Sequence, residues 1–171
     1  MTDLISRADV FAAAAHASID QRRKYTGDPY IVHPRRVAQT VKETGARDEV
    51  VAAALLHDVV EDTPVTLAEI RAEFGEDVAA LVEMVTDVSR PEDGNRKVRK
   101  AMDRDHLALA SAEGQTIKLA DLIDNTASIT RYDPGFARIY MREKAELLGV
   151  LEKGNKTFHQ HASFLVKLHR W

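Results

Sequence analysis

Apolar residues recur three and four positions apart along nearly all of the 171 residues, and this spacing is the strongest constraint on the fold. One face of an α-helix has this period, whereas a half-buried β-strand alternates apolar and polar residues. No segment between turn signals shows sustained alternation. The spacing therefore predicts an all-α protein, folded as a compact helical bundle.

Capping residues and helix breakers divide this pattern into separate helices. Asp48 is expected to cap a helix that Thr63 and Pro64 end, and residues 66–69 have the form of a capping box. Gly114 is expected to interrupt the pattern in the second half, and residues 89–95 form the clearest loop. The expected helices cover residues 4–20, a segment that begins at 33, and residues 48–62, 66–74, 76–88, 96–112, 116–130, 136–153 and 156–170.

Length and composition limit the class of protein. A chain of this length can bury a core as a single domain, residues 1–171, and it contains no internal repeat or interdomain linker. The longest uninterrupted apolar run, residues 50–56, is too short to span a bilayer. A net charge of −3 argues against a broad nucleic-acid-binding face. Because the chain has no cysteine and no secretory signal, we expect a cytoplasmic protein.

A few histidines and acids are the best candidates for chemistry. They are His33, the adjacent pairs His57–Asp58 and Glu61–Asp62, and Asp121. Imidazole and carboxylate ligands together suit Mn²⁺, Fe²⁺ or Zn²⁺ better than Ca²⁺ or Mg²⁺, although residue type does not choose among the first three. Such an ion lowers the pKa of bound water, and an acid outside its ligand shell can take or supply a proton. These residues therefore predict a metal site that activates water.

Helical spacing joins part of this set. On one helix face, His57 lies beside Glu61, and Asp58 lies beside both Glu61 and Asp62. Proline suits the first turn of a helix, so the proline that follows His33 places this histidine at the start of its helix rather than along its side. Taken alone, a His-Asp dipeptide is more often structural than functional.

A second group lies on one later helix. Asp121 and Asn125 are one turn apart, and Lys118 is one turn earlier. Spacing along the sequence does not by itself bring Asp121 and His33 to the same point.

Several short segments form a recognisable pattern in a fixed order over about residues 11–140. They are residues 21–24 (Gln-Arg-Arg-Lys), 29–34 (Pro-Tyr-Ile-Val-His-Pro), 54–63 (Ala-Leu-Leu-His-Asp-Val-Val-Glu-Asp-Thr), 66–67, 74–75, 85–87 (Val-Thr-Asp), 117–121 (Ile-Lys-Leu-Ala-Asp) and Asn125. With these segments the chain resembles the HD-domain hydrolases of the RelA/SpoT alarmone enzymes. The resemblance is closest to the single-domain small alarmone hydrolases and the metazoan SpoT homologue, and it implies a helical bundle of the HD-domain type.

The resemblance implies a metal-dependent 3′-pyrophosphohydrolase that converts ppGpp or pppGpp into GDP or GTP plus pyrophosphate. It implies one manganese ion held by His33, His57, Asp58 and Asp121. It also implies that Glu61 and Asp62 serve the attacking water and the leaving group. A chain of this extent lacks the synthetase and regulatory domains of the long enzymes, so we expect hydrolysis alone.

Contacts to the substrate are implied by the same resemblance. Arg23 and Lys24 match loop residues beside the base and its phosphates, and Asn125, Ser128 and Tyr140 match further substrate contacts. A basic stretch over residues 96–104 has two readings. It is either a solvated helix face, as charge runs usually are, or a segment from which Lys97 or a neighbour reaches the distal phosphates.

One segment departs from the family pattern and keeps other functions open. Residues 122–125 read Leu-Ile-Asp-Asn, where the long enzymes commonly have Arg-Leu-His-Asn. The alternatives are the same chemistry on an adenine alarmone or on the 2′-phosphate of NADPH, and a catalytically silent nucleotide-binding module. The expected partner is a small nucleotide polyphosphate, with no nucleic-acid polymer and no membrane, and homo-oligomerisation is left open. His16 and His106 are expected to be hydrogen-bonded or exposed.

Overall fold

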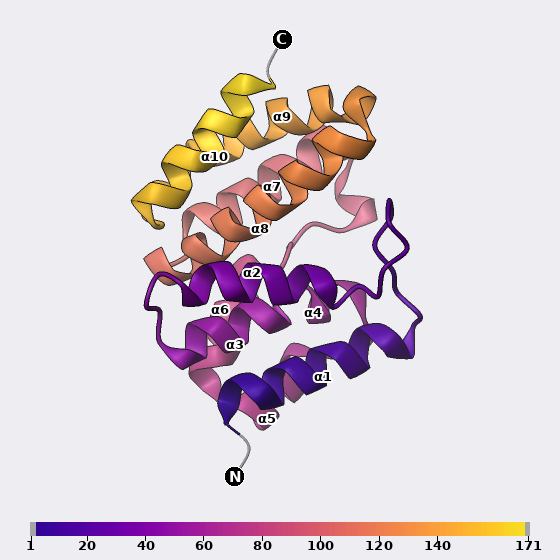
Figure 1. Ribbon diagram of the computed structural model, residues 1–171, viewed down its shortest axis with the longest axis vertical. Coiled ribbons are helices and arrows are strands. Elements are labelled where there is room, and N and C mark those ends of the chain that lie inside the picture. The colour runs from indigo at the N-terminus through magenta and orange to yellow at the C-terminus, as the bar shows by residue number, and fades with distance from the viewer. Residues whose placement is uncertain (1–2, 170–171) are drawn as a thin grey trace. The chain divides into compact units, whose positions relative to one another are not determined.

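The computed structural model describes residues 3–169 (Figure 1). Within that range the regular elements are helices, and the only bridge of β type is an isolated pair between Arg22 and Pro29. The predicted all-α class is confirmed. Contacts divide the chain into two compact units, Met1–Thr86 and Asp87–Trp171. Across residues 3–169, no helix combines the length and apolar character needed to cross a membrane.

The first unit is built around one central buried helix. Its elements are α1 (Leu4–Ser18), α2 (Val32–Lys42), α3 (Asp48–Leu56), α4 (Val59–Asp62), α5 (Leu67–Phe74) and α6 (Glu76–Val85). Every residue of α3 from Val50 to Leu56 is buried, because α1, α2 and α6 all pack against it. Figure 1 shows α3 and α4 between α1 and α2. The longest apolar run of the sequence is therefore the core of this unit.

The helix predicted over residues 48–62 is interrupted at His57 and Asp58, so the prediction was wrong there. The ring Nδ1 of His57 lies 2.7 Å from the carbonyl oxygen of Ala54, and Asp58 has φ −100° and ψ −4°. These dihedrals belong to the sparsely populated bridge region between helix and strand, where many active-site residues lie. Asp48 is also not the cap, since Arg47 holds that position and Asp48 begins α3.

Other local predictions fit the structure more closely. The backbone N–H of Glu69 donates to Thr66 Oγ1, and the Glu69 carboxylate accepts from the Thr66 N–H, so the predicted capping box begins α5. His33 lies in the first turn of α2, as predicted. Between α1 and α2, the loop is tied together by two backbone bonds, Arg23 N–H to Asp28 O and Tyr30 N–H to Gln21 O.

The second unit is a set of helices around α8. Its elements are η1 (Pro91–Asp93), α7 (Arg96–Ala108), α8 (Ala112–Tyr132), α9 (Pro134–Leu148) and α10 (Lys156–Leu168). Both α9 and α10 pack against α8, whose Ile117, Leu119 and Leu122 are buried. Gln115 is fully buried on α8, donates to the carbonyls of Leu107 and Val150, and so fastens the ends of the neighbouring helices.

Helix ends in this half differ from their predicted positions. Gly114 does not interrupt a helix; it lies in the first turn of α8, where its N–H donates to the Oγ of the capping Ser111. The helices predicted to end at residues 88, 112 and 153 end at 85, 108 and 148. The last helix is described to Leu168, and its predicted end at residue 170 lies outside the described residues.

Candidate metal centre and substrate site

Three of the predicted metal ligands lie together in the first unit. His33 comes from the first turn of α2, and His57 and Asp58 come from the turn between α3 and α4. One ligand atom from each of the three residues lies within 4.8 Å of the others. Asp58 Oδ2 is 3.1 Å from His57 Nε2 and 3.7 Å from His33 Nε2. Both imidazoles are buried and the carboxylate is half-buried, so a small cation could be held away from most of the solvent.

Hydrogen bonds orient two of these predicted ligands, His57 and Asp58. A carbonyl oxygen only accepts, so the bond to Ala54 places the His57 proton on Nδ1 and leaves the Nε2 lone pair on the side of Asp58. The Tyr30 hydroxyl donates to Asp58 Oδ2 at 2.7 Å, and its ring packs edge-on against His33. Two imidazole nitrogens and one carboxylate are a donor set that fits a divalent transition metal.

The two predicted catalytic acids are exposed at the end of α4, one turn from the ligand pair. Although Asp62 as a residue is exposed, partial burial of its carboxyl raises its pKa, and the negative charge of Asp58 acts in the same direction. Gln21 Nε2 donates to Asp62 Oδ2 at 2.9 Å, which opposes this rise. Glu61 lies beside Asp62 on the same short helix.

The loop before α2 carries the two basic residues predicted to meet the base and phosphates. The Arg23 guanidinium lies 5.7 Å from the ring centroid of Tyr30, the residue that bonds Asp58. Lys24 Nζ lies 5.1 Å from the ring of Tyr25. Ring contacts of this kind hold cations at defined positions on an otherwise polar loop.

Asp121 is buried in the second unit, and both of its carboxylate oxygens accept hydrogen bonds. Lys118 Nζ donates to Oδ2 at 2.9 Å and Asn125 Nδ2 donates to Oδ1 at 2.7 Å. The predicted grouping of these three residues on one helix is confirmed, because they stand three and four positions apart on α8.

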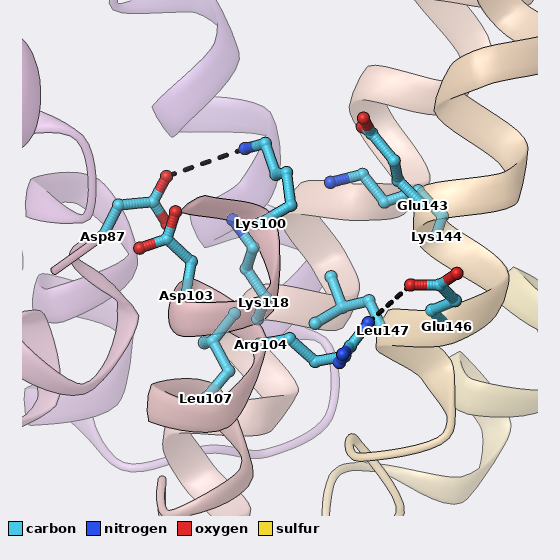
Figure 2. Close-up of a pocket in the computed structure, with 10 residues that line it drawn as sticks. All are labelled: Asp87, Lys100, Asp103, Arg104, Leu107, Lys118, Glu143, Lys144, Glu146 and Leu147. Atoms are coloured by element: carbon cyan, nitrogen blue, oxygen red, sulfur yellow. Dashed lines mark hydrogen bonds and ion pairs between the residues drawn. The ribbon is translucent and has the colours of Figure 1, made fainter. Parts of the chain in front are cut away.

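A pocket in the second unit, lined by four basic and four acidic side chains, was not predicted. Figure 2 shows lysine side chains that reach it from three helices, Lys100 of α7, Lys118 of α8 and Lys144 of α9. Lys100 forms an ion pair with Asp87 at 3.8 Å. Burial, with the neighbouring charges of Lys118 and Lys100, lowers the pKa of the Lys144 ammonium to about 8. Lys97 is exposed on α7, and Lys100 is the lysine of that helix that lines the pocket.

The remaining predicted substrate contacts lie on α8 and α9. Ser128 is half-buried on α8, three positions after Asn125. Tyr140 is buried, and this burial raises the pKa of its hydroxyl. The hydroxyl lies 3.4 Å from the carbonyl oxygen of Leu122. Lys144 Nζ is 4.9 Å from the ring of Tyr140. The substrate roles of these residues stay predictions.

The sequence model of the HD domain matches residues 8–144. The chain belongs to the HD-domain family. This HD domain is 43% identical over 128 residues to the guanosine-3′,5′-bis(diphosphate) 3′-pyrophosphohydrolase of Aquifex aeolicus, a match over 73% of this chain and 18% of that protein. The chain therefore spans about a fifth of the length of that relative.

Shorter relatives match this HD domain over most of their length. The guanosine-3′,5′-bis(diphosphate) 3′-pyrophosphohydrolase MESH1 of Homo sapiens is 40% identical over 155 residues, which cover 88% of this chain and 83% of that protein. Among solved structures, a metazoan ortholog of SpoT that hydrolyzes ppGpp matches with a TM-score of 0.86 and 27% identity, over 98% of this chain and 96% of that one. The resemblance seen in the sequence and the HD-type fold are confirmed.

Three residues around the metal group of this HD domain were not predicted as part of the site. Tyr30 and Gln21 lie inside the segments that resemble the family, but no role was predicted for either residue. His16 is buried and hydrogen-bonded, and its Nδ1 lies 2.7 Å from Gln21 Oε1. The one available signal was the clustering of His, Gln and Tyr just before the ligand-bearing helix, and that clustering is common in ordinary loops.

Proposed function

We propose that this HD domain is a metal-dependent 3′-pyrophosphohydrolase of guanosine alarmones, which converts ppGpp or pppGpp into GDP or GTP plus pyrophosphate. The observation that carries the proposal is the buried group of His33, His57 and Asp58, one turn before an acid pair. The match to human MESH1, 40% identical over 155 residues, supports the substrate class.

We further propose that the ion is a single Mn²⁺, with His33, His57, Asp58 and Asp121 as its ligands. The first three are supported by their proximity, and Asp121 by its place in a matched motif and by the family match, which runs through both units over residues 8–144. The same match supports one functional domain over residues 1–171. When bound, such an ion supplies Lewis-acid activation of a water nucleophile and neutralises charge on a phosphoryl oxygen.

The protein's own residues would then handle orientation and protons. Hydrolysis breaks the bond between the pyrophosphate and the ribose 3′ oxygen, while the water oxygen forms a new bond to phosphorus. One of Glu61 and Asp62 takes the proton that the water loses, and the other supplies a proton to the departing 3′ oxygen. Tyr30 holds Asp58 by its 2.7 Å hydrogen bond, so the ligand carboxylate keeps its direction through the reaction.

Cationic side chains would bind the polyphosphate. Arg23 and Lys24 are proposed to hold the base side and its phosphates, and Asn125, Ser128 and Tyr140 to contact the nucleotide from α8 and α9. Lys97 keeps its proposed role at the distal phosphates.

A substrate panel tests the proposal. Release of pyrophosphate and of phosphate is measured from ppGpp, ppApp and NADPH, with Mn²⁺ and with a chelator. We expect Mn²⁺-dependent pyrophosphate release from ppGpp. Faster release from ppApp, or phosphate release from NADPH, would replace the guanosine alarmone by one of these substrates, and Leu122 and Asp124 are the departures that favour such a change. Binding without turnover of any substrate would indicate a silent module.

Asp62→Ala tests the role of the acids. Because the carboxylate is proposed to move a proton rather than to bind, we expect kcat to fall by about 10² to 10⁴-fold while the affinities for Mn²⁺ and nucleotide hold. Asp105→Ala, an exposed acid on α7, is the matched control and should keep full turnover. Near-native turnover of Asp62→Ala would refute the assignment.

A further inference from the structure

A chain of two hydrogen bonds connects the buried histidine of α1 with one catalytic acid. His16 is 1% exposed, and its Nδ1 lies 2.7 Å from Gln21 Oε1. Gln21 Nε2 lies 2.9 Å from Asp62 Oδ2. The second ring nitrogen of His16, Nε2, is buried and has no hydrogen-bond partner among residues 3–169. The bond to Gln21 is therefore the polar contact that this imidazole makes within the part of the chain described.

The direction of these two hydrogen bonds follows from the chemistry of Asp62 at one end and His16 at the other. An ionised carboxylate oxygen only accepts hydrogen bonds, so the Gln21 amide must turn its NH₂ group toward Asp62 and its carbonyl oxygen toward His16. The carbonyl oxygen in turn requires a donor, so the proton of the neutral imidazole stands on His16 Nδ1. His16 thus selects the orientation of the amide, and the amide selects which atom Asp62 meets.

Gln21 has little freedom to turn away. Its backbone N–H donates to the backbone carbonyl oxygen of His16 at 3.0 Å, and its backbone carbonyl oxygen accepts from the backbone N–H of Tyr30 at 3.1 Å. The His16 ring also packs on the ring of Tyr30, with centroids 4.7 Å apart, and the Tyr30 hydroxyl bonds Asp58. One small framework therefore holds both a metal ligand and a catalytic acid.

We propose that His16 and Gln21 are positioning residues that fix the Asp62 carboxylate, with Oδ2 committed as an acceptor so that proton exchange with the reactants uses Oδ1. This inference rests on the proposed function, in which Asp62 moves a proton. It assigns no substrate contact to either residue. We call the two hydrogen bonds from His16 through Gln21 to Asp62 the relay. Without the relay, the Asp62 carboxylate would retain its charge but lose its fixed direction, and proton transfer depends steeply on direction and distance.

Three variants test the relay by steady-state kinetics on ppGpp with Mn²⁺. His16→Leu and Gln21→Met each remove one link, and we expect kcat to fall by about 10- to 100-fold, the usual effect of losing a residue that orients an active-site group. KM and the Mn²⁺ affinity should stay within about twofold, because neither residue binds substrate or metal. His16→Asn offers an amide N–H near the position of Nδ1 and should recover most of the loss.

Gln39→Met is the matched control. It removes a glutamine whose Nε2 donates to Glu43 Oε1 on an exposed face of α2, so kcat should not change. Circular dichroism of each variant separates a loss of kcat from a loss of folded protein. If His16→Leu unfolds, Gln21→Met decides the question, because Gln21 is only half-buried. An unchanged kcat in folded Gln21→Met, or a fall in Mn²⁺ affinity that accounts for the whole loss, would overturn the proposal.

A measurement without turnover keeps this inference separate from the proposed function. Long-range ¹H–¹⁵N correlation spectra of the intact protein report which ring nitrogen of a histidine carries the proton, and the His16 signal is the one absent from His16→Asn. We expect a proton on Nδ1, which Gln21→Met no longer enforces. A proton on Nε2 in the native protein would refute the relay even if ppGpp is hydrolysed. If His16 carries its proton on Nδ1 but the protein hydrolyses none of ppGpp, ppApp and NADPH, the hydrogen-bond arrangement is supported and the proposed function is refuted.

Discussion

Replacing Lys144 by methionine should stabilise the protein near neutral pH and leave its stability nearly unchanged at high pH. The Lys144 side chain lines the pocket of Figure 2 between helices, and burial lowers its pKa from 10.5 to about 8. The like charges of Lys118 and Lys100 act in the same direction. Methionine has a similar length and no charge, so it keeps the packing of the alkyl chain without the buried ammonium.

The magnitude follows from the two protonation equilibria. Below pH 8 the amine is charged in both the folded and the unfolded chain, so the full cost of burying the charge is present. Between pH 8 and 10.5 the unfolded chain binds more protons, so stability rises with pH. A fall of the pKa from 10.5 to about 8 corresponds to at most about 3.5 kcal/mol, since each tenfold change in proton affinity is worth about 1.4 kcal/mol.

Urea unfolding followed by circular dichroism measures the effect at about pH 7 and about pH 10. The quantity compared is the difference in unfolding free energy between Lys144→Met and the native protein. In this difference the contributions of the other titrating groups cancel. We expect it to favour the variant by about 3 kcal/mol at neutral pH and by about 1 kcal/mol or less at the higher pH. Lys153→Met, an exposed lysine of the same unit, should give no such difference. An equal difference at both pH values would refute the reasoning, because it would show that charge burial is not the cause.

Two further predictions concern the metal group and the packing of α8. Tyr30→Phe removes the hydroxyl that donates to Asp58 and should weaken Mn²⁺ binding by about tenfold in a calorimetric titration; an unchanged affinity would show that the bond does not orient the ligand. Gly154→Ala places a Cβ 2.6 Å from Leu119 Cδ1, so thermal and urea unfolding should report a loss of about 1 to 3 kcal/mol. Gly135→Ala, where the nearest atom is 3.9 Å away, should cost nothing, and an equal loss in both variants would contradict the packing explanation.

Local features were predicted well because they depend on helical geometry alone. The period of apolar residues indicates helices throughout, and the structure described is helical. The Thr66 capping box and the grouping of Lys118, Asp121 and Asn125 involve residues only three or four positions apart, whose distances are set once a helix forms. Helix ends were placed less well, as at Gly114, because a glycine in a first turn is held by its cap and by packing.

The break at His57 and Asp58 could not be read from the sequence. The periodic pattern continues through residues 48–62, and each residue there is compatible with a helix. The turn is held because the His57 ring bonds the carbonyl oxygen of Ala54 and because Tyr30, 28 positions earlier, bonds Asp58. Contacts over such distances along the chain depend on how α1, α2 and α3 pack, which no local spacing encodes.

The sequence by itself determined that this chain is helical, which residues could bind a metal, and which family it resembles. Only the tertiary structure decided that His33 meets His57 and Asp58, that His16 and Gln21 lie behind Asp62, and that Lys144 lines a pocket of mixed charge between helices. The physical reason is one of range. Helical periodicity relates neighbours within about four positions, whereas burial and hydrogen bonding between helices relate side chains that only the packed core brings together.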